Sequence, residues 1–203
     1  MPDMKINSDL KLAFPIRWTE KGETLEPLIW AYHTPISREV FEANYRVIAG
    51  TYKTLFEKGS GFAVATAPII GTLALRDVAR ADAIANGLAL EGDPSTPLLA
   101  ELKRLTMVIA PGAQGYDTVP VDVALTRNII DADEWKETEA SIVFFTCGSW
   151  MATRKSKDLM NSGLAFALQG SITSLSPMAF ADGLVTSMKP AISAVFEPSL
   201  VPS

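Results

Sequence analysis

Two single residues of this sequence have side chains suited to nucleophilic or acid–base chemistry. His33 is the only imidazole among the 203 residues, so it is the only group whose ordinary pKa suits a general base near neutral pH. Cys147 is the only thiol, and it lies in an apolar stretch where burial would raise its pKa. No serine has the strand–turn–helix setting of a nucleophile. We therefore expect no catalytic residue, and a structural role for both side chains.

Metal and cofactor sites are not indicated either. One histidine and one cysteine exclude a disulfide framework and a Cys/His zinc site within one chain. The carboxylates at 131–139 offer oxygen ligands for Mg²⁺ or Ca²⁺, but their spacing does not match an EF-hand loop. The start of a helix accounts for these charges, because the helix dipole favours acidic side chains there. The glycine turns at 59–61 and 111–115 lack the motifs that bind phosphates or dinucleotides.

The composition indicates an acidic, folded protein. Hydrophobic residues make up 48% of the chain and charged residues 20%, which supports a sizeable core. The net charge of −5 leaves no basic surplus for a nucleic acid. The most apolar run, 62–75, is shorter than the ~20 residues that span a bilayer and contains Pro68. Residues 1–9 do not resemble a signal peptide, so we expect a soluble, cytoplasmic protein without membrane or nucleic-acid partners.

The first part of the chain predicts a hairpin. Apolar residues alternate over 10–18, which is typical of a strand, and Pro15 favours the edge of a sheet. A polar connection at 19–26 leads to a second strand at 28–33. Serine, threonine and proline residues after this strand then indicate the start of a helix. Its apolar stripe runs over 41–56, and we expect the helix to end at Gly59.

The remaining elements are predicted from local signals along the chain. Helices are expected at 68–85, 96–105, 131–151 and 158–168, and a second small hairpin is expected near 107–121. The helix at 131–151 is acidic at its start, is followed by basic residues, and is apolar almost all round between them. A helix of this kind is central in a core or covered by a partner.

Together these elements predict an α+β fold that is predominantly α-helical. An N-terminal antiparallel β-hairpin packs on a bundle of about five helices, and the second small hairpin lies beside them. We expect a single globular domain over 1–170. Residues 171–203 then form a C-terminal arm with a short helix from Pro177 to about Leu184 and a flexible tail after Met188.

Apolar residues exceed what a core of this size needs. Three apolar segments, at 62–75, around Phe144 and at 175–180, cannot all be buried in one core of this size. A segment that stays exposed would be a docking surface for another chain or for a second copy of this one. A homo-oligomer is therefore possible. The candidate partner-binding residues are apolar side chains from the first and last of these regions: Leu175, Met178, Phe180, Leu184, Ile69 and Ile70.

Five segments resemble the tail assembly chaperones of long-tailed, siphovirus-type bacteriophages. They are KINSDLKLAFP (5–15), AYHTPISREVF (31–41), VPVDVAL (119–125), DADEW (131–135) and GSITSLSPMAFAD (170–182). The resemblance implies a non-enzymatic factor that binds and solubilises the tape-measure protein and helps recruit the major tail protein. It also implies a protein of the host cytoplasm that is absent from the mature virion.

The chaperone hypothesis has a mechanism and two competitors. Apolar helix surface would cover apolar stripes of the tape-measure helices, many copies would add avidity, and the arm around Phe180 would fold on binding. A virion structural component, such as a tail-completion or minor tail protein, would instead pack the N-terminal hairpin into a ring. A small enzyme would have to use His33 and carboxylates.

Overall fold

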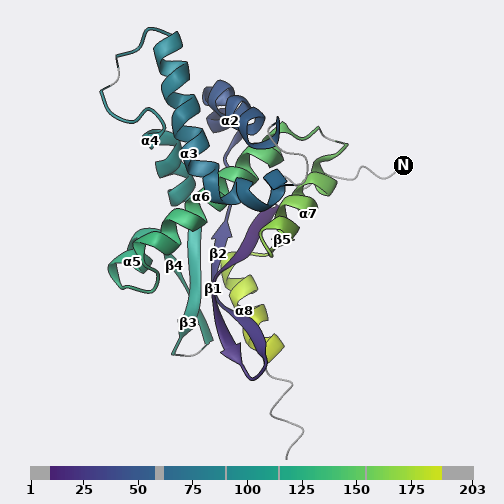
Figure 1. Cartoon of the computed structure of the whole chain (residues 1–203). Coiled ribbons are helices and arrows are strands. Elements are labelled where there is room, and N and C mark those ends of the chain that lie inside the picture. Colours follow the sequence, from purple (N-terminus) through teal and green to yellow (C-terminus); the bar gives the residue numbers. More distant parts are fainter. Residues whose placement is uncertain (1–9, 58–61, 90, 114, 154, 189–203) are drawn as a thin grey trace, which may run out of the picture.

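The computed structural model describes residues 10–57, 62–89, 91–113, 115–153 and 155–188 (Figure 1). The fold is α+β with more helix than strand, as predicted. The strands are β1 (Lys11–Lys21), β2 (Thr24–His33), β3 (Thr106–Gly112), β4 (Gly115–Pro120) and β5 (Ser171–Thr173). The helices are α1 (Arg38–Ala43), α2 (Tyr45–Glu57), α3 (Phe62–Ala85), α4 (Thr96–Arg104), α5 (Val121–Thr126), α6 (Ala132–Met151), α7 (Lys157–Ala167) and α8 (Pro177–Met188).

Both predicted hairpins belong to one antiparallel sheet with the strand order β4-β3-β2-β1-β5. The hairpins are joined where β2 pairs with β3, from Trp30 opposite Ile109 to His33 opposite Thr106. The N-terminal hairpin is longer than predicted, because 19–26 is mostly strand and the turn is confined to Gly22, at φ +65°, and its neighbour Glu23. Strand β5 was not predicted, since its three residues form a strand only by pairing with β1.

Pro15 lies on an open edge, although β1 as a whole is not an edge strand. β5 pairs only with Lys11, Leu12 and Ala13, so β1 is central there and has a free edge from Phe14 onward. The pairing of β1 with β2 is irregular between Pro15 and Trp18. The missing N–H of proline is tolerated at such a place because no ladder partner needs it.

Both faces of the sheet are covered. Alternation along the strands directs Leu12, Phe14, Ala31 and Val108 into the main core, which they share with α6, α4 and α2. The opposite face carries Ala13, Tyr32 and Ile109, and α8 covers it with Ala181. In Figure 1, α8 (yellow) runs along the sheet, while α2, α3 and α6 gather at the other end of the molecule.

Helix α6 is the centre of the main core, and its side chains from Ile142 to Ser149 are all buried, as its apolar circumference predicted. Helix α3 packs closely against it, because Gly71 has no side chain: a Cβ there would lie 2.2 Å from the carbonyl oxygen of Ala140. Helix α3 begins at Phe62, earlier than predicted, and contains Pro68. Within the described ranges, no helix combines the length and apolar character that crossing a membrane requires.

The helix predicted to start near 34–37 and to end at Gly59 is interrupted within its apolar stripe. Asn44 separates α1 from α2, and its Nδ2 donates to the carbonyl oxygen of Val40 at 2.8 Å. The backbone N–H of Asn44 is shared between the carbonyl oxygens of Val40 and Phe41, at 3.2 and 3.1 Å, as is common where a helix ends. The predicted end at Gly59 lies outside the described residues.

Residues 171–188 lie on the sheet. The ring of Phe180 contacts the rings of Trp30 and Tyr32, with centroids 5.5 and 5.7 Å away. The Tyr32 hydroxyl donates to the carbonyl oxygen of Leu175. The flexible tail predicted after Met188 lies outside the described residues.

Candidate functional site

His33 is placed in the core at the end of β2. Its side chain is fully buried, and its Nδ1 lies 3.0 Å from Oγ1 of Thr106 on β3. Burial disfavours the imidazolium and lowers the pKa of His33 to about 3. The imidazole is therefore neutral at physiological pH, but it has no surface from which to take a proton from a substrate.

Cys147 is similarly enclosed. It lies on the buried face of α6, 1% exposed, and burial raises the pKa of its thiol to about 12. A thiol of this kind behaves as a small apolar side chain, because only the thiolate is a good nucleophile.

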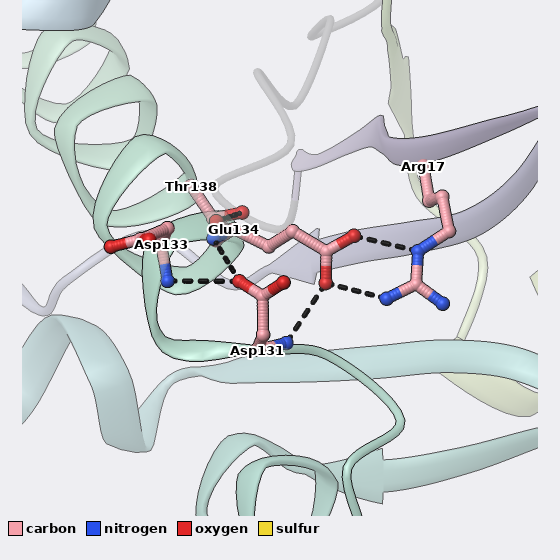
Figure 2. A network of polar contacts seen from close by, with 5 residues as sticks. All are labelled: Arg17, Asp131, Asp133, Glu134 and Thr138. Atoms are coloured by element: carbon pink, nitrogen blue, oxygen red, sulfur yellow. Dashed lines mark hydrogen bonds and ion pairs between the residues drawn. The ribbon is translucent and has the colours of Figure 1, made fainter.

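The carboxylates at 131–139 lie at the start of α6, as predicted, and two of them, Asp131 and Glu134, cap the helix (Figure 2). Oδ1 of Asp131 accepts from the backbone N–H groups of Asp133 and Glu134, and Glu134 accepts in return from the N–H of Asp131 at 2.9 Å. Glu134 also binds Arg17 of β1 through two bonds of 2.6 Å. The network therefore fixes the start of α6 against the sheet. Among the residues the structure describes, no group of three or more His, Cys, Asp or Glu is arranged to hold a metal ion.

The six residues predicted to bind a partner fall into two separate places. Ile69 and Ile70 lie on α3, which packs on α2 and α6, and Ile69 is 69% exposed. Leu175 precedes α8 and Met178 is in its first turn, and both are exposed. Phe180 and Leu184, on the same helix, pack against the sheet. The exposed members are therefore Ile69, Ile70, Leu175 and Met178.

Sequence reasoning missed a third apolar surface, on α7. Leu159 and Phe166 are 80% and 86% exposed, and their spacing of seven residues places them on one face, two turns apart. Gly163 lies between them, and a Cβ added there meets no atom within 4 Å. The spacing of Leu159 and Phe166 can be seen in the sequence. Only the fold shows that Leu164 and Ala165, on the opposite face of α7, are buried.

On α3, the apolar surface at Ile69 continues one turn later with Leu73, which is 61% exposed. The two residues extend the apolar surface along the outer side of the helix, because positions four apart lie on one face. Together with α7 and the start of α8, three helices thus offer apolar side chains to solvent. Such surfaces can accept the apolar face of another helix.

No protein-family model matches this chain, and neither a curated protein nor a solved structure does.

Proposed function

We propose that this chain is a non-enzymatic tail assembly chaperone of a long-tailed bacteriophage. It binds and solubilises the tape-measure protein in the host cytoplasm and helps recruit the major tail protein. The observation that carries the proposal is the exposure of large apolar side chains on α3, α7 and the start of α8. A protein that keeps an apolar, helical client in solution needs such surface, and the net charge of −5 supports solubility of the complex.

The face of α7 is the best-formed docking surface for a client helix. Leu159 and Phe166 form two apolar ridges, and Gly163 between them lets a second helix approach closely. Each such contact is small, so single sites bind weakly. Many copies along one long client would raise the overall affinity through avidity.

Co-expression with the tape-measure protein tests the proposal. We expect a client that is insoluble alone to elute with this chain as a multi-copy complex in size-exclusion chromatography with light scattering. A client that stays insoluble while this chain elutes alone would contradict the proposal.

A virion structural component, such as a tail-completion or minor tail protein, is the second candidate. The free edge of β1 beyond Ala13 favours it, since an unpaired strand can join the sheet of a neighbouring copy in a ring. Stoichiometric amounts of the chain in purified particles would support this function over the chaperone.

A further inference from the structure

A cleft of about 430 Å³ lies where β2 leads into α1 and where α6 meets α7. One part of its lining is apolar, with Ile36, Leu105 and Trp150. The other part is polar, with Lys11 from the start of β1 and Lys157 and Asn161 from α7. Clefts of this size that combine apolar walls with a few polar groups are typical of ligand sites.

The cleft carries positive charge that its own carboxylates do not neutralise. Two arginines at its rim are already paired: Arg104 with Glu101 at 2.7 and 2.8 Å, and Arg38 with Glu42 at 2.7 Å. In the described part of the chain, Lys11 and Lys157 form no ion pair; Nζ of Lys11 is 3.5 Å from the carbonyl oxygen of Leu175.

The ammonium group of Lys157 lies over an aromatic ring. Nζ of Lys157 lies 5.3 Å from the centre of the Trp150 ring, at the apolar wall of the cleft. The ammonium group of Lys11 is hydrogen-bonded to Leu175, which does not line the cleft, so Lys157 is the lysine that brings an unpaired charge to the apolar wall. An ammonium group placed there in an acidic protein indicates an anionic ligand.

Asn161 adds a hydrogen-bond acceptor. Its side chain is 3% exposed and lines the cleft, and its Oδ1 atom has no hydrogen-bond partner among the residues that the structure describes. It follows Lys157 by one helical turn, so the two side chains lie on the same face of α7. Leaving a buried acceptor unpaired costs free energy, and a ligand that donates an N–H removes this cost. A bare anion offers no such donor.

We propose that this cleft binds the carboxyl-terminal residue of a protein partner. The terminal carboxylate pairs with the ammonium group of Lys157, and the last peptide N–H donates to Oδ1 of Asn161. An apolar terminal side chain packs on Ile36, Leu105 and Trp150. The inference rests on the cleft alone and does not depend on the chaperone proposal.

The test is a ¹H–¹⁵N NMR titration of the full chain with N-acetyl-L-phenylalanine, which carries the carboxylate, the amide N–H and an apolar side chain. N-acetyl-L-phenylalaninamide, which lacks the carboxylate, is the matched probe. We expect saturable shifts at the Trp150 indole N–H with a dissociation constant on the order of 1 mM. The amide should bind at least about tenfold more weakly, since it forms no ion pair.

Substitutions locate the binding within the cleft. Lys157→Met should weaken binding of the carboxylate about tenfold, and Asn161→Leu should weaken both probes. Lys155→Met removes the same charge from an exposed residue outside the cleft and should leave binding unchanged. Retained dispersion of the spectra confirms that each variant is folded.

Three results would overturn the inference. They are equal binding of the amide probe, unchanged binding in the Lys157→Met variant, and no shift up to about 20 mM probe, well above the dissociation constant expected for a ligand of this size. Shifts produced equally by acetate would also overturn it, because they would show a general anion site. The outcome is separate from that of co-expression, which tests client solubility.

Discussion

The hydrogen bonds around His33 determine which ring nitrogen carries its proton. Thr106 has one hydroxyl proton, which Oγ1 donates to the carbonyl oxygen of Leu102 at 2.8 Å. His33 Nδ1 therefore donates to Oγ1, and Nε2 is left as a buried acceptor that finds no partner in the described part of the chain. Protonation of Nε2 would place a full charge in the core, which explains why the pKa of His33 is lowered.

The lowered pKa of His33 predicts that the protein loses stability as the pH falls. The unfolded chain binds this proton near pH 6.5 and the folded chain only near pH 3, so acid favours unfolding between these values. From pH 7.5 to pH 5.0 the contribution of His33 amounts to a loss of about 2 kcal/mol in the free energy of unfolding. Urea unfolding at both pH values measures this loss.

His33→Asn is the comparison for that experiment. The Asn side chain retains a donor toward Thr106 and does not titrate, so its loss of stability between the two pH values should be smaller by about 2 kcal/mol. The carboxylates titrate in both proteins and cancel in the comparison. Equal losses in the two proteins would contradict the buried, neutral imidazole.

At the scale of the element, the contact between α3 and α6 depends on Gly71. Gly71→Ala places a methyl group against the backbone oxygen of Ala140, which cannot move without shifting α6. We expect a loss of about 1–3 kcal/mol in the free energy of unfolding. Gly163→Ala is the matched control in open space on α7, and it should stabilise by about 0.5–1 kcal/mol because alanine favours the helix. A neutral Gly71→Ala would show that the two helices are not held this closely.

The apolar face of α7 predicts variants that separate client binding from folding. Leu159→Ser and Phe166→Ser alter side chains that are mostly in solvent, so the free energy of unfolding should change by less than about 0.5 kcal/mol. The amount of tape-measure protein kept soluble in co-expression should fall several-fold. Leu25→Ser, at the tip of the first hairpin, is an exposed apolar control that should leave solubilisation unchanged. An undiminished yield from both α7 variants would exclude this face as the client site.

The elements that were predicted best are those whose signals are local. The helix at 131–151 was predicted from the acidic residues at its start, and the structure has this helix, with a capping box formed by Asp131 and Glu134. The break at Asn44 and strand β5 were missed, since the first is a local change in backbone hydrogen bonding and the second depends on pairing with a distant strand. The exposure of single side chains was harder still to predict. Met178 and Phe180 are two residues apart on α8, yet Met178 faces solvent and Phe180 faces the sheet. Only the tertiary arrangement decides between them.

At the scale of the whole molecule, residues 171–188 complete the sheet. Deleting 171–203 removes both β5 and α8, and it uncovers the face that carries Trp30, Tyr32 and Ile109. We expect the truncated protein to bind the dye ANS and to unfold at lower urea concentration than the full chain. A truncated protein that keeps its unfolding midpoint and does not bind ANS would contradict this prediction.

That deletion is therefore unsuited to testing whether the segment binds a client. Met178→Ser is the better variant, since Met178 is 71% exposed and its loss leaves the packing of Phe180 intact. A reduced yield of soluble client with this variant would assign a binding role to the start of α8.

The bond between Tyr32 and Leu175, which joins positions 143 residues apart in the sequence, bears on how the chain folds during synthesis. Ribosomes add about 5–20 residues per second, so the first hairpin waits for several seconds before β5 and α8 emerge. During this interval the face with Trp30 and Tyr32 is uncovered, and contacts this distant in sequence form slowly. Nascent chains that are released or stalled before α8 is made would expose this apolar face of the sheet, and cellular quality control would recognise them as incompletely folded.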